Sequence, residues 1–194
     1  MTIGHFTISN VNIISINSTY DVYGLIDTNL TTKYTGLVVY QTQSNIKHSK
    51  TTHGDKMVNF IKKIAPNSNI YYYDATDENG EIKTKNIIDG LEWMINNNIK
   101  KVNISLSSKE YNETLETWLK VHRDNIQVFA SYNNQLNTFD YPAMYDYVIG
   151  SGNGKKIFYK DIDQIYKSDL ILINKKLKLY RGNSYLSIVT MVSN

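Results

Sequence analysis

The chain has 194 residues, a formal net charge of +3, 20% charged residues and 41% hydrophobic residues. This length suits one domain with a sizeable core, so we expect residues 1–194 to form a single domain. The small charge, with lysines scattered along the chain, gives no indication of nucleic-acid binding. The absence of cysteine excludes disulfides, thiolate metal sites and cysteine nucleophiles.

The N-terminal segment "MTIGHFTISN" lacks the basic and apolar regions of a signal peptide. The chain also contains no run of about 18 consecutive apolar residues, which is the length that a membrane-spanning helix needs. The sequence therefore predicts a soluble, cytoplasmic protein with no membrane association.

Short apolar runs alternate with helical patterns along the chain. We expect strands at 11–16, 22–26 and 35–41, then a helix over 55–64 that Pro66 ends. The middle of the chain predicts a strand at 69–75, a helix over 85–98, a strand at 100–107, a helix over 111–122 and a strand at 126–131. The remaining elements are strands at 145–150, 169–173 and 177–180 and a helix over 184–192. This alternation predicts a three-layer α/β fold, with a mostly parallel sheet flanked by helices and ligands bound beyond the carboxyl ends of its strands.

Two features could indicate a cofactor or metal site. The segment "GSGNGKK" at 150–156 lacks the spacing of a phosphate-binding loop, and strand-like residues follow it where a nucleotide fold needs a helix. A plain loop is the better interpretation, with a nucleotide-binding α/β protein as a minor alternative. The four histidines, His5, His48, His53 and His122, share no ligand spacing. The sequence therefore predicts neither a metal site nor a cofactor.

Three polar residues occupy positions where either structure or chemistry could explain them. His53 and Gly54 stand at the start of an amphipathic helix, as a polar turn or as a general base beside a glycine. Ser184 opens the last apolar helix, either as a capping serine or where a helix N-terminus favours developing negative charge. Asn133 follows a strand end in "VFASYNN", where an asparagine is common in a turn.

Taken together, these segments resemble motifs of the subtilisin-like serine proteases. The similar segments are "HGDKMV", "APNSNIYYYDA", "IIDGLEWMINNNIKKVNISLS", "VFASYNN", "YPAMYDYVIGSG" and "GNSYLS", in the family's order. The resemblance implies a C-terminally shortened subtilisin-like fold with Ser184 as nucleophile and His53 as base. It further implies an oxyanion hole formed by the Asn133 amide and the Ser184 backbone N–H.

The resemblance also implies a substrate, an extended peptide or protein that binds as an added strand along residues 105–108. The residues implied to bind it are Ser105, Leu106, Ser107, Ser131 and Tyr132. Tyr132 replaces a family glycine on the wall of the pocket for the residue before the cleaved bond, so we expect that pocket to be small or closed.

The third member of the triad has two candidates. Aligning "SNVNIISINST" with the family's first core strand places Asn17 where an aspartate belongs, and the longer, more apolar strand before it favours this register. The rival register uses "YGLIDTN", which supplies a carboxylate at Asp27. An asparagine could hold the imidazole by hydrogen bonding, but it could not stabilise the imidazolium.

These observations support two functions. The first is a serine endopeptidase with a narrow peptide target. The second is a catalytically impaired subtilase that binds a peptide or a protein partner. The doubtful aspartate, Tyr132 and the short C-terminus favour the second. We expect either that a partner protein covers the core that the shortened C-terminus leaves exposed, or that the chain is a minimal version of the family.

Overall fold

A seven-stranded parallel sheet forms the centre of the protein. The computed structural model describes residues 12–13, 21–40, 51–135, 140–154, 160–166, 170–173 and 176–194. The sheet has the order β3-β4-β2-β5-β6-β7-β8, and every neighbouring pair is parallel. Its strands are β2 (Val22–Asp27), β3 (Leu37–Tyr40), β4 (Asn69–Asp74), β5 (Lys101–Ile104), β6 (Gln127–Ser131), β7 (Val148–Asn153) and β8 (Gln164–Tyr166). Because the strands are parallel, their carboxyl ends meet at one edge of the sheet.

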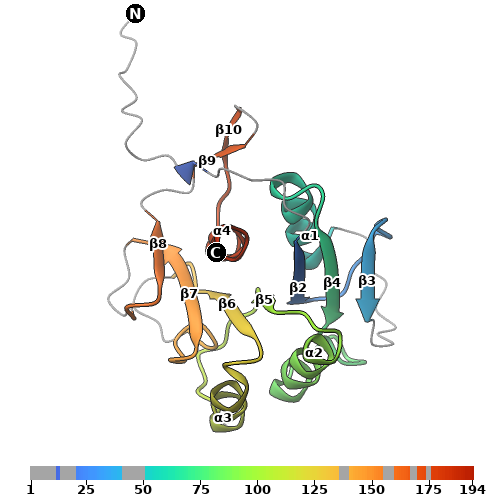
Figure 1. Cartoon of the computed structure of the whole chain (residues 1–194), viewed down its shortest axis with the longest axis vertical. Coiled ribbons are helices and arrows are strands. Elements are labelled where there is room, and N and C mark those ends of the chain that lie inside the picture. Colours follow the sequence, from blue (N-terminus) through green and yellow to red (C-terminus); the bar gives the residue numbers. More distant parts are fainter. Residues whose placement is uncertain are drawn as a thin grey trace, which may run out of the picture.

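Helices cover both faces of this sheet (Figure 1). Helices α1 (His53–Ile64) and α4 (Asn183–Ser193) lie on one face, and α2 (Thr84–Asn96) and α3 (Glu113–His122) lie on the other. Two separate apolar clusters fill the layers between the helices and the sheet. The predicted three-layer α/β architecture is confirmed. None of the helices in the described ranges is long and apolar enough to cross a membrane.

The last two predicted strands do not close the main sheet. Strands β9 (Leu170–Ile173) and β10 (Lys176–Leu179) form an antiparallel pair, and β1 (Asn12–Ile13) adds to β9 in parallel. Of the strand expected at 11–16, only Asn12 and Ile13 lie within the described residues. The main sheet instead ends at β8, which the sequence pattern did not indicate because it is only three residues long.

Two element boundaries bear on the site. Helix α1 begins at His53 itself, because the Thr52 side chain accepts from Asp55 N while the Asp55 side chain accepts from the Thr52 backbone. His53 is therefore the first helical residue and does not belong to a preceding turn. The prediction of a plain loop at 150–156 is partly wrong, because residues 150–153 belong to strand β7.

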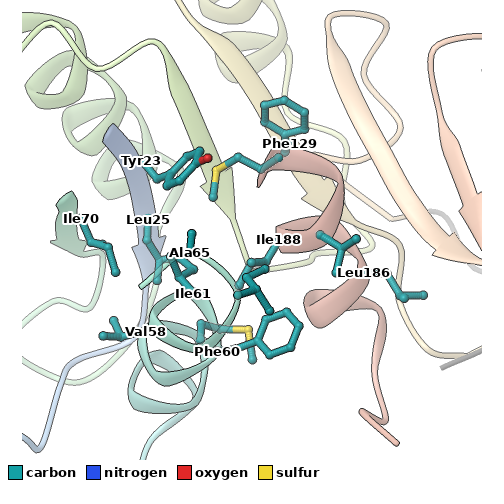
Figure 2. Packing of buried hydrophobic residues seen from close by; sticks show 14 of the residues in the cluster. Tyr23, Leu25, Val58, Phe60, Ile61, Ala65, Ile70, Phe129, Leu186 and Ile188 are labelled. Carbon is teal, nitrogen blue, oxygen red and sulfur yellow. The ribbon is translucent and has the colours of Figure 1, made fainter. Parts of the chain in front are cut away.

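The first apolar cluster joins α1 to α4 (Figure 2). Phe60 and Ile61 of α1 pack in the same cluster as Leu186 and Ile188 of α4, and all four are fully or almost fully buried. Within the described residues, the apolar side chains of α4 are therefore covered by the chain itself. This packing fixes the two helices that carry His53 and Ser184 relative to each other.

Candidate active site

A carboxylate and an imidazole meet at the carboxyl edge of the sheet. Asp27 is the last residue of β2 and is fully buried, while the His53 side chain is 38% exposed. His53 Nδ1 lies 2.8 Å from Asp27 Oδ2 and 3.0 Å from Oδ1. The Thr28 backbone N–H also donates to Oδ1, at 2.6 Å. The carboxylate is thus held in place on one oxygen and receives the Nδ1 proton on the other, which leaves the opposite ring nitrogen free to act as a base.

The carboxylate also sets the basicity of the imidazole. Burial lowers the pKa of His53, but the hydrogen bond that its Nδ1–H donates to Asp27 and the charge of that carboxylate raise it more, so the net pKa lies above its ordinary value. Lys56, in the first turn of the same helix, lowers it slightly. The pair therefore favours the protonated imidazole, which is the form that a general base reaches after it takes a proton.

Gly54 allows the start of α1 to approach the segment after β2. A Cβ atom at this position would lie 2.6 Å from the carbonyl oxygen of Thr28 and still closer to the Tyr72 hydroxyl. The Tyr72 hydroxyl donates to that same carbonyl, and the Gly54 N–H donates to Thr28 Oγ1 at 3.2 Å. The close packing of these groups requires glycine beside the histidine.

Asp55 ties the loop after Asp27 to the helix that carries His53, a role that its place in the sequence did not indicate. Its buried carboxylate accepts from Thr31 N at 3.3 Å, from the Tyr34 hydroxyl at 3.1 Å and from Thr52 N at 3.0 Å. Burial raises the pKa of Asp55, but hydrogen bonds from Thr31, Thr52 and Tyr34 lower it further, so its net pKa lies below the ordinary value. The one sequence signal for this network was the capping pattern, an acidic residue three positions after a threonine.

Ser184 is the second residue of α4 and is half-buried. Gly182 precedes the helix with φ of 120°, a conformation that other residues rarely adopt. The ring of Tyr185 packs edge-on against Phe60 of α1, with centroids 5.0 Å apart. Among the described residues, no hydrogen bond joins Ser184 Oγ to the imidazole. The structure therefore places Ser184 at the N-terminus of a helix packed against α1, where the helix dipole favours negative charge.

Asn133 lies two residues beyond the end of β6. Its backbone N–H donates to Asp140 Oδ2 at 3.0 Å, and its side-chain oxygen accepts from Gln135 N at 3.0 Å. With the oxygen engaged in this turn, the side-chain NH₂ is the group that remains to donate. These two hydrogen bonds fix Asn133 in the turn after β6.

Asn183 joins the segment containing Asn133 to helix α4. Its buried side-chain nitrogen donates to the carbonyl oxygens of Tyr132, at 3.0 Å, and Asn133, at 3.1 Å. Its side-chain oxygen accepts from Asn153 N at 3.1 Å, and its backbone N–H donates to Asn134 Oδ1 at 2.8 Å. The residue before Ser184 therefore fixes the backbone of the candidate oxyanion asparagine, which local sequence patterns did not indicate.

A second buried polar group connects α4 to the strand on which substrate is expected to bind. The Asn103 side chain donates to Ser187 Oγ and accepts from Ser105 Oγ, and all three residues are buried. Asn103 and Ser187 are 84 positions apart, so no local pattern pairs them. Their contact positions the first two turns of α4 over the end of β5.

Three of the residues expected to bind substrate, Ser105, Leu106 and Ser107, follow β5 directly. Ser105 is buried, Leu106 is half-buried and Ser107 is exposed, while Ser108 pairs with Tyr141 through two backbone hydrogen bonds of 2.8 Å. A cavity of about 480 Å³ opens beside this segment. Its walls include Ile87, Leu106, Leu115, Tyr111, Tyr141 and Tyr145.

Ser131 and Tyr132 lie across from that segment, at the end of β6. Both are buried, and Tyr132 N donates to Ser151 O at 2.9 Å. The Tyr132 ring lies against Gly150 of β7, where an added Cβ would come within 2.6 Å of it. Its hydroxyl donates to Asp163. The ring thus occupies space that a glycine at this position would leave open.

The remaining candidate residues lie outside this arrangement or outside the described part of the chain. Asn17, His5 and His48 are not among the described residues. His122, at the end of α3, stacks with Trp118 at a centroid distance of 4.3 Å. Of the two triad candidates, Asp27 is therefore the one that the structure brings to His53.

Comparisons with known proteins identify the family of the chain. The model of the Subtilase family matches residues 31–169. The chain belongs to the subtilase family. The matched range begins after Asp27 and ends before Ser184, so the placement of these two residues rests on the structure.

Curated subtilases share moderate identity with part of the chain. The chain is 30% identical over 133 residues to a thermostable alkaline protease of Halalkalibacterium halodurans. This match covers 64% of this chain and 36% of that protein. The chain is 33% identical over 95 residues to a subtilisin of Bacillus pumilus, which covers 46% of this chain and 34% of that protein. The chain thus spans about a third of the length of these relatives.

Solved subtilases share the fold over a larger part of the chain. The protease domain of PatA, solved as a mutant, is 14% identical with a TM-score of 0.67 and covers 92% of this chain and 79% of that one. The prenylagaramide maturation protease PagA is 15% identical with a TM-score of 0.65. The match covers 89% of this chain and 73% of PagA. At this identity, the likeness establishes the subtilase fold alone.

Proposed function

We propose that this subtilase is a serine endopeptidase that cleaves an extended segment of a peptide substrate. The buried Asp27 carboxylate against His53 Nδ1 is the observation that carries the proposal. A buried, hydrogen-bonded carboxylate that fixes an imidazole costs desolvation free energy, and acyl transfer is the chemistry in which this arrangement is used. Family membership supports the same reaction class.

In the proposed reaction, Ser184 Oγ attacks the carbonyl carbon of the substrate peptide bond while His53 Nε2 takes the hydroxyl proton. Asp27 holds Nδ1–H and stabilises the imidazolium that forms. His53 then returns the proton to the leaving amine, which departs from the acylated serine. Water, deprotonated by the same imidazole, attacks the acyl group and restores Ser184.

The oxyanion formed at each attack would be stabilised by the Asn133 NH₂ and by the Ser184 backbone N–H at the N-terminus of α4. Asn183 supports this role because it fixes the Asn133 backbone to α4. The catalytic hydrogen bond between Ser184 and His53 would form as substrate closes the site, since such bonds are commonly long without substrate.

The substrate would pair with the backbone of the Ser105–Ser107 segment, as an added strand. One of its side chains would enter the adjacent cavity, whose walls combine apolar and aromatic residues with polar ones that include Lys83 and Glu110. The family resemblance places Tyr132 at the pocket for the residue before the cleaved bond, where a tyrosine would favour a small residue and hence a narrow target. The cytoplasmic location expected from the sequence remains a prediction.

A fluorophosphonate probe tests the proposal, because it phosphonylates only a serine that a base activates. We expect covalent labelling of the wild-type chain, mapped to Ser184 by mass spectrometry and absent in Ser184→Ala. Ser193→Ala is the control, because Ser193 is an exposed serine at the end of the same helix. Ser187→Ala would be less informative, because Ser187 Oγ accepts a hydrogen bond from Asn103.

Tyr132 also favours the alternative function, an impaired protease that binds a peptide without cleaving it. A folded wild-type chain that takes up no probe at neutral or alkaline pH would support that alternative and exclude the protease. Labelling that persists in Ser184→Ala would place the reactive serine elsewhere and would also contradict the proposal.

A further inference from the structure

Three residues hold three different polar groups of Asn133. Asp140 Oδ2 accepts from the Asn133 backbone N–H at 3.0 Å. The Asn183 side-chain nitrogen donates to the Asn133 backbone carbonyl at 3.1 Å, and Gln135 N donates to Asn133 Oδ1 at 3.0 Å. Within the described part of the chain, the side-chain NH₂ is thus the group of Asn133 that these bonds leave available.

Asp140 differs from the other two residues because it holds Asn133 with a fully buried carboxylate. Placing a carboxylate in the interior costs desolvation free energy that a neutral acceptor would avoid. In return, a hydrogen bond to a charged acceptor is about twice as strong as one between neutral groups. A backbone N–H needs only a neutral acceptor, so the carboxylate holds Asn133 more firmly than satisfaction of that N–H requires.

The backbone that carries Asp140 is itself fixed at two points. The Asp140 carbonyl oxygen accepts from Met144 N at 2.9 Å, which closes a turn. The next residue, Tyr141, exchanges two backbone hydrogen bonds of 2.8 Å with Ser108, at the end of the segment expected to bind substrate. Asn133, two residues beyond the end of β6, is therefore bonded to a firmly placed group.

We propose that Asp140 is a positioning residue, which holds Asn133 where its NH₂ can donate to the oxyanion. An oxyanion donor must lie about 2.7–3.1 Å from the oxygen that it stabilises, so a small displacement of the Asn133 backbone would weaken the bond. Asp140 acts through the Asn133 backbone and does not touch the substrate. The inference rests on the proposed function, in which Asn133 is the oxyanion donor.

Fluorophosphonate labelling of Asp140→Ala, alone and combined with Asn133→Ala, tests the proposal. Asp140→Ala should lower the second-order rate constant for labelling of Ser184 by about 10- to 100-fold, the loss that matches one hydrogen bond to a charged group. In the Asn133→Ala background, the same change should alter the rate by less than about twofold, because the group that Asp140 positions is absent. A merely structural role would lower the rate in both backgrounds.

The side-chain NH₂ resonance of Asn133 gives a readout that does not depend on rate. In ¹⁵N-labelled protein, this resonance is identified by its absence from Asn133→Ala. It should move downfield on phosphonylation of the wild type, because its protons bind the phosphonyl oxygen. The movement should be smaller in phosphonylated Asp140→Ala and larger again in Asp140→Asn, whose amide oxygen can still accept from Asn133 N without the charge.

Asp74→Ala is the matched control, because Asp74 is also a fully buried carboxylate and accepts from a backbone N–H, that of Thr76 at 2.9 Å. Its labelling rate and its NH₂ resonance should stay close to those of the wild type. If Asp140→Ala does not fold, Asp140→Asn replaces it in the cycle, where we expect a smaller loss that again disappears in the Asn133→Ala background.

Two results would overturn this inference and leave the proposed function standing. One is a wild type that is labelled while the Asp140 variant reacts within about twofold of it. The other is an equal loss of rate with and without the Asn133 side chain. A folded wild type that is not labelled would overturn the proposed function together with this inference.

Discussion

Replacing Asp27 with asparagine should disable His53 by changing the position of one proton. The two carboxylate oxygens have different partners: Oδ1 accepts from Thr28 N at 2.6 Å, and Oδ2 faces His53 Nδ1 at 2.8 Å. An asparagine must direct its oxygen at the Thr28 N–H, because the NH₂ group cannot accept a proton. Its NH₂ group then faces Nδ1 and donates to it, which forces the ring proton onto Nε2. In that tautomer His53 cannot take the proton of Ser184.

The size of the effect follows from the loss of the base. The corresponding substitution in another serine protease lowers kcat by about 10⁴, which amounts to about 5 kcal/mol in the activation free energy. We expect a comparable loss in the second-order rate constant for fluorophosphonate labelling of Ser184. The charge and hydrogen bond that raise the His53 pKa are lost while the burial that lowers it remains. The residual rate of Asp27→Asn should therefore reach its plateau at a lower pH than the wild-type rate.

Asp74→Asn is the matched control. Asp74 is equally buried, ends strand β4 and is the register partner of Asp27, but it binds Thr76 and does not contact His53. We expect its labelling rate to stay close to that of the wild type. An Asp27→Asn protein that labels within about tenfold of the wild type would refute the proposed role of Asp27.

Further variants test the rest of the site. Gly54→Ala should lower the free energy of unfolding by about 1–3 kcal/mol in urea titrations, because its Cβ would lie 2.6 Å from the Thr28 carbonyl. Asn133→Ala should slow labelling by about 10²–10³, the loss seen when a subtilisin lacks its oxyanion asparagine. Asn183→Ala should slow labelling in the wild type but add little in the Asn133→Ala background, and additive effects in this double-mutant cycle would contradict a shared role. Asn17→Asp should leave the labelling rate unchanged, whereas a large increase would indicate that residue 17 is the third member of the triad.

The fold could be predicted because its signals are local. Apolar runs of strand length alternate with amphipathic helical segments, and this alternation is sufficient to predict a parallel sheet with helices on both faces. The roles of Asp27 and Asn133 were predicted from the family resemblance, and the structure places them at the ends of β2 and β6, which share one edge of the sheet. The choice between Asn17 and Asp27 was harder. Apolar content favoured the strand over 11–16, but its described part, Asn12 and Ile13, pairs with β9 outside the main sheet.

The groups that hold the site together could not be predicted, because each joins residues that are distant in sequence. The Asn103 side chain meets Ser187 across 84 positions, and Asn183 meets Tyr132 across 51. A local pattern records which residues favour a helix or a strand, whereas these contacts arise only from the packing of α4 against the sheet.

Acylation of the protein by p-nitrophenyl acetate tests the central claim most directly, because it follows transfer of an acyl group to one hydroxyl. The account predicts a burst of nitrophenol on mixing and an acetyl group on the peptide that contains Ser184. Both should disappear in Ser184→Ala and slow severely in His53→Ala. A folded wild-type protein that shows no burst, or that carries the acetyl group only on other residues, would contradict the claim that Asp27 and His53 activate Ser184.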